Sequence, residues 1–178
     1  MLETYFGYTS FRPAQEAPIA SLLRNEDVIG IMPTGAGKSI CFQIPALCKA
    51  GLTIVFSPLI SLMKDQVDGL LVQNIPAALI NSTLTQAEFN KTMYEVRSGK
   101  IKLLYIAPER LGSNFFCNVL RALPIAQVIV DEAHCISEWG HDFRPSYRLI
   151  GEWLNSLPKR PIVGAFTATA TKYVENDI

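Results

Sequence analysis

VIGIMPTGAGKS, residues 28–39, places a short apolar run directly before a glycine-rich turn and the start of a helical segment. Gly35 and Gly37 allow the backbone to turn so that successive N–H groups point at an anion, and the following helix adds its positive N-terminal end. Lys38 would reach the outer phosphates of a nucleotide, and Ser39 would ligate magnesium. The context of strand, glycine-rich turn and helix therefore predicts a phosphate-binding loop for a nucleoside triphosphate.

The loop departs from the strict GxxxxGKS/T pattern at one position, because Met32 stands where that pattern has its first glycine. The alternative is a plain glycine-rich turn with an exposed lysine. We favour nucleotide binding, because GKS falls at a strand-to-helix junction and an acidic strand end follows downstream. The residues expected to hold the nucleotide phosphates are Thr34, Gly35, Ala36, Gly37, Lys38 and Ser39.

Short apolar runs recur along the whole chain and alternate with segments of helical spacing. The runs are VIGIM (28–32), TIVFS (53–57), AALIN (77–81), KLLYIA (102–107), QVIVDEA (127–133) and PIVGAFTA (161–168). Most of them are unbroken rather than alternating, which is typical of strands buried on both faces of a parallel sheet. The sequence thus predicts an α/β fold, a mostly parallel sheet with helices on both faces, whose ligands lie at the carboxyl ends of the strands.

Two of the intervening segments have a clear helical stripe. One stripe is formed by Leu59, Met63, Val67 and Leu70, and the other by Phe89, Met93 and Val96. Thr85, with Glu88 three residues later, has the spacing of a capping box at the start of the second helix. The final segment TKYVENDI (171–178) predicts the first turns of a further helix, and we expect the protein to continue beyond it.

Composition limits the class of protein. The 178 residues are enough for one domain, 49% are hydrophobic, and 16 Lys and Arg balance 16 Asp and Glu. Because the formal net charge is zero, any contact with nucleic acid must be local. The four cysteines form no CxxC pair and are expected to be buried and reduced. No apolar stretch has the length of a membrane span, so we expect an intracellular protein, cytoplasmic in a bacterium or nuclear in a eukaryote.

DEAHCISEWGHDFR, residues 131–144, contains both histidines of the chain and four acidic side chains. Asp131 and Glu132 follow the apolar run QVIV, which places them at the tip of a buried strand. Beside a triphosphate, an aspartate there holds Mg²⁺, and the adjacent glutamate orients the attacking water. The predicted metal is therefore magnesium, with Ser39 and Asp131 as its protein contacts.

Zinc is the rival interpretation of the same stretch. His134 and His141 are seven residues apart rather than the four of HExxH, and Cys135 has no nearby cysteine partner. We expect no zinc in this chain. His134 is either a catalytic residue beside the carboxylate pair or a hydrogen-bonded core histidine.

VDEAH, together with MPTGAGKS upstream, resembles the RecQ family of superfamily-2 DNA helicases, and the resemblance runs from FGYTSFRPAQ to AFTATAT. CISEWGHDFRP is similar to the aromatic-rich loop that in this family senses single-stranded DNA and couples it to ATP hydrolysis. Aromatic side chains and arginine in such a loop offer stacking and ionic contacts. The resemblance assigns DNA contacts in the loop to Trp139, His141, Phe143 and Arg144. A packed surface loop is the alternative.

The resemblance also gives roles to three further segments. It assigns Tyr8, Arg12 and Gln15 to adenine binding, although Pro18 predicts a kink in the helix that carries Gln15. SPLISLMKDQ (57–66) and PER (108–110) resemble DNA-backbone motifs, with Ser57 and Arg110 near phosphates. We interpret Lys64 and Asp65 as a solvated helix face. FTATAT (166–171) resembles the motif that links the two sites through Thr167 and Thr169.

The resemblance implies a first RecA-like P-loop NTPase domain over residues 1–178, with a second RecA-like domain, a zinc module and a winged helix outside it. The expected cofactors are ATP and Mg²⁺, and the expected activity is 3′–5′ translocation on single-stranded and forked DNA by a monomer. Without the second motor domain, the chain should hydrolyse ATP poorly.

Three other functions stay open. A P-loop GTPase lacks support because the guanine-reading NKxD is absent, with Thr92 and Met93 following Asn90 and Lys91. A small-molecule kinase would need an acceptor pocket and a lid. A nucleotide-responsive DNA-binding module without turnover is the non-enzyme alternative.

Overall fold

The computed structural model describes residues 1–140 and 142–178. Within these residues, six strands form one sheet in the order β1-β6-β5-β2-β4-β3, and every neighbouring pair is parallel. The strands are β1 (Val28–Ile31), β2 (Leu52–Phe56), β3 (Ala77–Ile80), β4 (Leu103–Ile106), β5 (Ile125–Asp131) and β6 (Ile162–Thr167). The predicted α/β fold with a parallel sheet is confirmed.

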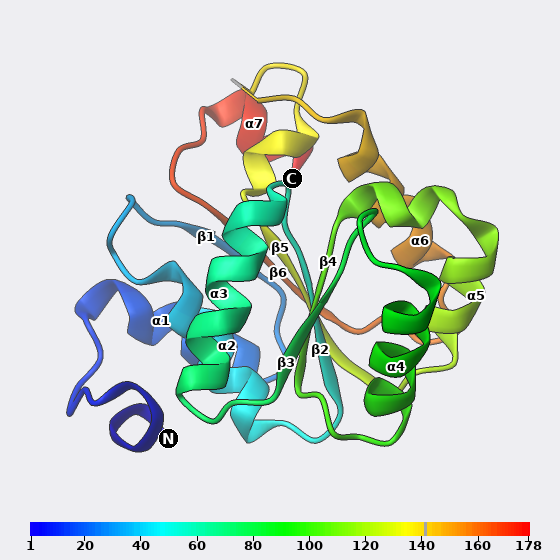
Figure 1. The fold of residues 1–178 in the computed structure, drawn as a ribbon. Helices are drawn as coiled ribbons and strands as arrows, with labels where there is room; N and C mark the ends of the chain where they lie inside the picture. The colour runs from blue at the N-terminus through cyan, green and yellow to red at the C-terminus, as the bar shows by residue number, and fades with distance from the viewer. Residues whose placement is uncertain (141) are drawn as a thin grey trace.

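Helices cover both faces of this sheet, as Figure 1 shows. One face carries α1 (Pro13–Leu23), α2 (Lys38–Cys48) and α3 (Ile60–Val72), and the other carries α4 (Gln86–Arg97), α5 (Asn114–Arg121) and α6 (Arg148–Asn155). The last helix, α7 (Lys172–Asp177), packs against a short 3₁₀ turn, Ala133–Ile136. Further short helical turns are Leu2–Phe6, Pro108–Gly112 and Pro145–Tyr147.

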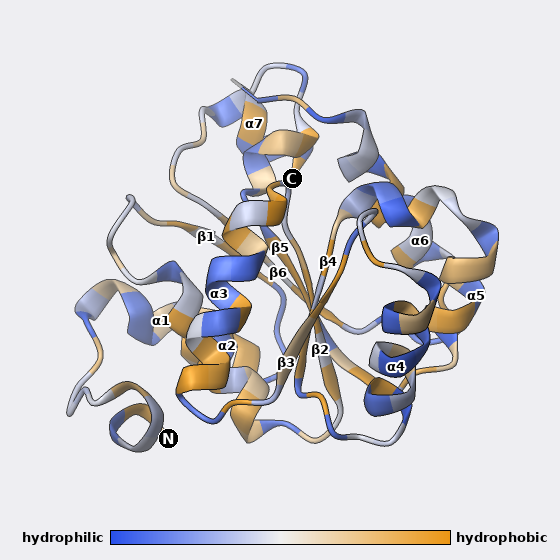
Figure 2. Ribbon diagram, in the orientation of Figure 1, coloured by the Kyte–Doolittle hydropathy of each residue, from blue (hydrophilic) through white to orange (hydrophobic). Residues whose placement is uncertain are grey.

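The core consists of two hydrophobic clusters, one on each side of the sheet. Side chains of one strand alternate between them: Ile54 and Phe56 belong to the cluster under α4, α5 and α6, while Val55 belongs to the cluster under α1, α2 and α3. All residues of β2 are buried, which explains its unbroken apolar sequence. Figure 2 shows these largely hydrophobic strands between helices that carry hydrophilic residues.

The helical stripes behave as their spacing predicts, with one exception. Met63, Val67, Leu70, Phe89, Met93 and Val96 are all buried. Leu59 precedes α3 and is exposed, so its place in the stripe was predicted wrongly. The capping box of α4 is confirmed, because the Thr85 backbone N–H donates to Glu88 Oε2 over 2.8 Å and the Glu88 N–H donates to Thr85 Oγ1.

Several sequence predictions need correction in detail. Strand β5 begins at Ile125 and ends at Asp131, so residues 132 and 133 of the predicted strand lie outside it. The reason is that Glu132 adopts a left-handed backbone conformation, with φ of 50°, which no strand continues. Helix α1 continues through Pro18 to Leu23, and the kink expected at Pro18 stays a prediction. Cys41, Cys117 and Cys135 are buried as expected, but Cys48 is exposed at the end of α2.

The fold gathers the predicted site residues at one edge of the sheet. The register pairs Ile31 with Thr167 and Asp131 with Phe166, so the carboxyl ends of β1, β6 and β5 lie side by side. The phosphate loop, the DEAH segment and the TATAT segment each follow one of these strands. None of the helices in the described part of the chain is long and apolar enough to span a membrane.

Candidate nucleotide and DNA sites

The loop between β1 and α2 has the geometry of an anion cradle. Gly35 and Gly37 have φ of 81° and 83°, the left-handed region that glycine adopts without steric cost, and Gly37 is the N-cap of α2. The loop is anchored at its start, where the Met32 N–H donates to Thr167 O over 2.9 Å. The Met32 side chain is buried, 3.6 Å from Cys41 Sγ, so the departure from the strict motif is absorbed by packing behind the loop.

Arg12 and Gln15 hold the loop from the side of α1. Gln15 Nε2 donates to Ala36 O and Gly37 O over 3.3 and 3.1 Å, and Arg12 Nη1 donates to Gly35 O over 2.6 Å. These bonds occupy the loop carbonyls from the side of α1. The Ala36 N–H donates to Pro33 O over 3.0 Å, so the N–H groups on either side of it are the ones left for an anion. Gln15 Oε1 also accepts from the Arg12 N–H over 2.8 Å, in the capping box of α1. Both amide hydrogens of Gln15 are thus used inside the protein, a bracing role that sequence reasoning missed.

A hollow of about 400 Å³ brings most of the predicted nucleotide residues together with the carboxylate pair. Its lining consists of Tyr8, Ser10, Arg12, Gln15, Thr34, Gly35, Gly37, Lys38, Ser39, Ile40, Leu62, Gln66, Asp131 and Glu132. Of the predicted nucleotide residues, Ala36 does not line it and contributes a carbonyl to Gln15 instead. A cavity of this size is within the range of small-molecule sites.

Asp131 and Glu132 lie at the floor of this hollow. Lys38 Nζ is 3.5 Å from Glu132 Oε1, and both side chains are largely shielded from solvent. Burial first, and the neighbouring Glu132 charge second, together raise the pKa of Asp131 to about 6, against a hydrogen bond from Gln66 that lowers it. A buried carboxylate pair near one lysine is short of positive charge, which fits the donor set of a hard divalent cation such as Mg²⁺.

A buried chain of hydrogen bonds supports Asp131 from behind. Gln66 Nε2 lies 3.4 Å from Asp131 Oδ2, and the Tyr105 hydroxyl donates to Gln66 Oε1 over 2.9 Å. Gln66 belongs to α3 and Tyr105 to β4, so the carboxylate is tied to two elements outside the phosphate loop. Sequence reasoning missed both residues, although Gln66 ends the segment SPLISLMKDQ that was singled out.

His134 connects the carboxylates to β6. It is buried, its Nδ1 lies 2.8 Å from Thr167 Oγ1 and 3.3 Å from Glu132 Oε2. Thr167 Oγ1 donates to Thr169 O over 3.0 Å, so Thr169 takes part through its backbone. The histidine is therefore both hydrogen-bonded and adjacent to the candidate catalytic carboxylate.

The loop after His134 presents aromatic surface. The Trp139 side chain is 78% exposed, and its ring lies 6.4 Å from that of Tyr173 in α7. The Phe143 ring lies under the Arg148 guanidinium, 5.3 Å away. Arg144 is bonded within the protein, to Asp142 Oδ2 and to Pro58 O. It therefore ties the loop to the segment after β2, and its predicted DNA contact stays a prediction. His141 lies outside the described residues.

The two remaining predicted DNA residues are placed differently from each other. Ser57 lies directly after β2 and is fully buried, so its hydroxyl is not accessible to a phosphate in this conformation. Its contact with DNA stays a prediction. The Arg110 guanidinium lies over the rings of Phe89 and Phe116, at 5.4 and 5.1 Å. Its orientation is therefore set by cation–π contacts.

One further group has possible metal ligands. Ligand atoms of His134, Cys135 and Asp142 lie within 4.8 Å of one another. Burial raises the pKa of the Cys135 thiol to about 12, and Asp142 is already paired with Arg144 at 3.1 Å. Asp142 would have to exchange its contact with Arg144 for the ion, and the expected absence of zinc from this chain stays a prediction.

We expect Asp131→Asn to stabilise the metal-free domain at neutral pH. The folded-state pKa of about 6 lies above the ordinary aspartate value of 3.8. The stability that this group contributes is therefore full below pH 3.8 and is lost as the pH rises through about 6. Asparagine removes that penalty, and a gain of roughly 1–3 kcal/mol is expected, because one pKa unit corresponds to about 1.4 kcal/mol. Thermal unfolding without magnesium measures it, and a lower melting temperature would contradict the burial argument.

Comparisons with known proteins identify the family. The family model described as DEAD/DEAH box helicase matches residues 12–176. The ATP-dependent DNA helicase RecQ of Bacillus subtilis (strain 168) is 51% identical over 179 residues, covering 100% of this chain and 30% of that protein. The protein of the same name from Haemophilus influenzae is 47% identical over 178 residues, covering 100% of this chain and 29% of that protein. The chain thus spans about 30% of the length of these curated relatives.

A solved structure gives the same fold. The hypothetical ATP-dependent RNA helicase from Sulfolobus tokodaii superimposes with a TM-score of 0.73 at 21% sequence identity, over 99% of this chain and 54% of that one. At this identity the likeness concerns the fold alone.

Proposed function

The chain belongs to the DEAD/DEAH box helicase family, and from that premise we propose that it is the ATP-binding motor domain of a RecQ-type, ATP-dependent 3′–5′ DNA helicase. The observation that carries the proposal is the hollow in which the phosphate loop, Lys38 and the two carboxylates meet. Because the relatives are named ATP-dependent DNA helicases, we propose ATP as the nucleotide and DNA as the nucleic acid.

In the proposed nucleotide site, the Lys38 ammonium and the N–H groups of residues 34, 35 and 37–39 bind the phosphates, since the Ala36 N–H donates to Pro33 O. Ser39 and Asp131 would hold Mg²⁺, which would neutralise charge on the phosphate oxygens. Tyr8, which is 53% exposed at the rim, offers its ring to the adenine base. Gln15 Oε1 keeps a second lone pair for the exocyclic amine of adenine, while its amide hydrogens hold the loop.

In the proposed catalytic step, Glu132 orients and polarises the attacking water. Its carboxylate lies between Lys38 and His134, at 3.5 and 3.3 Å, so its position depends on both neighbours. His134 and Thr167 connect this carboxylate to the end of β6, which leads to α7, so a shift of α7 would move the Glu132 carboxylate. We propose this connection as the path by which DNA on the aromatic loop influences turnover.

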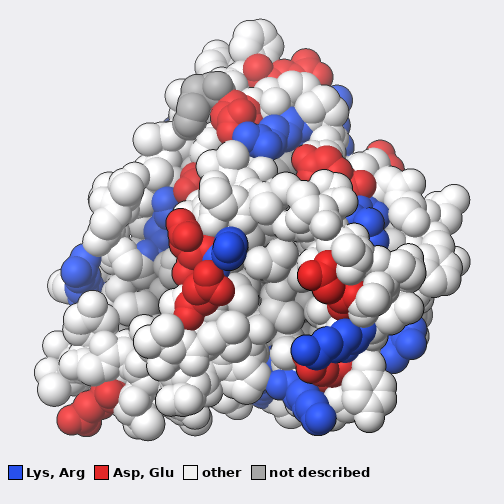
Figure 3. All heavy atoms as spheres, in the orientation of Figure 1, with Lys and Arg blue, Asp and Glu red and all other residues white. Residues whose placement is uncertain are grey.

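In the proposed DNA site, Trp139 and Phe143 offer stacking surfaces, and the strand ends near Ser57 and Arg110 form the backbone track. Figure 3 shows basic and acidic side chains interspersed on the face of the molecule that Figure 1 presents, so the described residues form no continuous basic surface on this face. Forked and single-stranded DNA are the proposed partners. A second RecA-like domain, a zinc module and a winged helix are proposed beyond these residues, in an intracellular monomer without zinc in this domain.

The alternative is a nucleotide-responsive DNA-binding module without turnover of its own. ATP hydrolysis by this chain, measured with and without single-stranded oligothymidylate, separates the two. Stimulation by DNA supports the motor domain. DNA binding that responds to nucleotide, with no hydrolysis, supports the module.

Trp139→Ala is expected to weaken binding of labelled oligothymidylate by about tenfold, because stacking of one base on an aromatic ring is worth about 1–3 kcal/mol. Trp139→Phe should keep most of the affinity. Tyr94→Ala is the matched control, since that side chain is 67% exposed on α4. Fluorescence anisotropy measures the affinity. Equal affinities of Trp139→Ala and the unmodified chain would remove this loop from the DNA site.

A further inference from the structure

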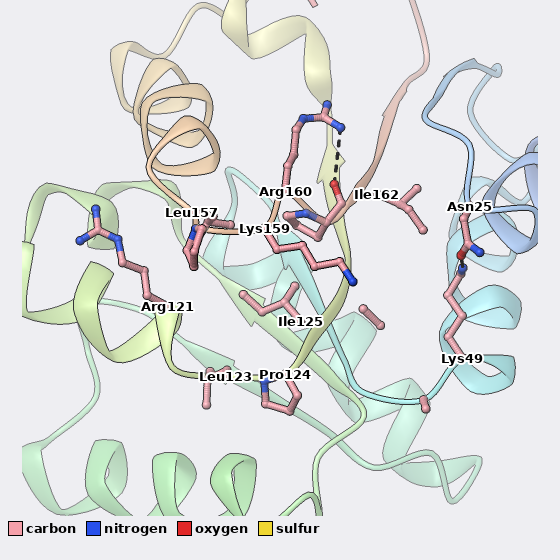
Figure 4. Close-up of a pocket in the computed structure, with 14 residues that line it drawn as sticks. Asn25, Lys49, Arg121, Leu123, Pro124, Ile125, Leu157, Lys159, Arg160 and Ile162 are labelled. Atoms are coloured by element: carbon pink, nitrogen blue, oxygen red, sulfur yellow. Dashed lines mark hydrogen bonds between the residues drawn. The ribbon is translucent and has the colours of Figure 1, made fainter.

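A second hollow lies at the opposite edge of the sheet from the phosphate loop. It has a volume of about 720 Å³ and is formed by the turns that lead into β1, β2, β5 and β6. Figure 4 shows Arg121 at one side and Lys49 at the other, with Lys159 and Arg160 between them. The nucleotide and DNA proposals use none of these residues.

The hollow is strongly basic for a chain whose formal net charge is zero. Its lining includes Lys49, Arg121, Lys159 and Arg160 and no Asp or Glu. Lys49 and Arg121 bond to the neutral amide oxygens of Asn25 and Asn118. Arg160 is paired with a carboxylate just outside the lining, that of Asp27, at 2.7 Å. Lys159 has no hydrogen bond or ion pair with another residue in the described part of the chain.

The local excess of positive charge is therefore not neutralised by the protein itself. The lining contains four cationic side chains, and one of them is paired with a carboxylate, so three positive charges have no carboxylate partner among the described residues. Such a concave basic surface attracts and concentrates anionic partners.

The floor between the cations is apolar. Leu123, Ile125 and Ile162 line it, and in Figure 4 the Lys159 side chain extends between the last two. The Leu52 N–H donates to Pro124 O over 2.9 Å, which fixes the turn before β5 to the start of β2. Gly51 is required beside it, because its φ is 100° and a Cβ there would lie 2.6 Å from Pro124 O. The turn before β5 is thus held against the start of β2.

We propose that this basic hollow binds an acidic peptide segment that carries an apolar side chain. Carboxylates of the peptide would pair with Lys159, Arg121 and Lys49, and its apolar side chain would cover Ile125 and Ile162. The phosphates of a nucleic acid strand could pair with the cations, but its backbone offers no aliphatic side chain to cover Ile125 and Ile162. The volume also suits a few residues of peptide rather than a duplex.

The test uses this chain and a fluorescein-labelled peptide in which aspartates surround two leucines. Lys159→Glu combined with Arg121→Glu should weaken binding by about fivefold, since two exposed pairs worth roughly 0.5 kcal/mol each are lost. The matched control is Lys91→Glu combined with Arg97→Glu, which makes the same charge change on exposed positions of α4. Thermal unfolding of both variants checks that they fold.

Three comparisons decide the outcome. Weaker binding of the Lys159/Arg121 variant than of the α4 variant, together with weaker binding of a peptide with serine in place of leucine, supports the proposal. Equal loss in both variants means a general charge effect and overturns it. Competition by oligothymidylate that depends on Lys159 and Arg121 would assign the hollow to nucleic acid and also overturn it, as would the absence of peptide binding.

Discussion

Lys38→Ala is expected to weaken binding of magnesium-ATP by roughly 100-fold, because the variant loses a cation whose charge-assisted hydrogen bonds are each worth about 1.5–3 kcal/mol. The Lys38 side chain is only 13% exposed, so its charge acts with little solvent screening. The substitution also leaves Glu132 without its lysine partner at 3.5 Å, next to the Asp131 carboxylate. The loop N–H groups remain, so weak phosphate binding should persist.

The measurement is displacement of a fluorescent ATP analogue by ATP and, separately, by GTP, in magnesium. Lys91→Ala removes an exposed lysine of α4 and serves as the matched control. A preference for ATP that disappears in Lys38→Ala supports both the phosphate loop and the adenine contacts. Equal affinity for ATP and GTP would contradict the roles proposed for Tyr8 and Gln15. Unchanged ATP affinity in Lys38→Ala would contradict the phosphate site itself.

The second large effect is expected at Glu132. Glu132→Gln should lower the rate of ATP hydrolysis at least about 100-fold while leaving ATP affinity within a few fold, because general-base assistance contributes about 10²- to 10⁴-fold. Glutamine has nearly the same shape but cannot accept a proton, so the geometry of the hollow is kept. The left-handed backbone of residue 132, with φ of 50°, holds either side chain toward Lys38 and His134.

Single-turnover hydrolysis, with protein in excess over labelled ATP and with oligothymidylate present, resolves slow rates. Glu152→Gln, on the exposed side of α6, is the control for a lost surface carboxylate. A rate equal to that of the unmodified chain would mean that another group orients the water. Loss of ATP binding together with hydrolysis would instead assign Glu132 to the binding of nucleotide.

At Asp131, the charge proposed to bind magnesium also lowers the stability of the metal-free fold. Asp131 is 4% exposed, and its raised pKa means that the folded chain holds it ionised at a cost. That cost is what makes a divalent cation favourable there. The expected stabilisation of metal-free Asp131→Asn and the expected loss of hydrolysis in Glu132→Gln therefore test two different properties of adjacent residues.

The sequence by itself determined the fold class, the phosphate loop, the position of the carboxylate pair and the family. These follow from local features: unbroken apolar runs specify buried parallel strands, and glycine spacing specifies a turn that only a few residue types allow. The helical stripe of α4 and its capping box were likewise readable, because both depend on residues at most a few positions apart.

Only the tertiary structure decided which groups face one another across the sheet. The bonds from Gln15 to the phosphate loop join residues more than twenty positions apart, and the path from Tyr105 through Gln66 to Asp131 joins three elements. Arg144 reaches Pro58 O in the same way, across 86 positions. The basic hollow likewise collects four separate turns because parallel strands bring their amino ends to one edge. Such contacts depend on strand order, which local spacing does not encode.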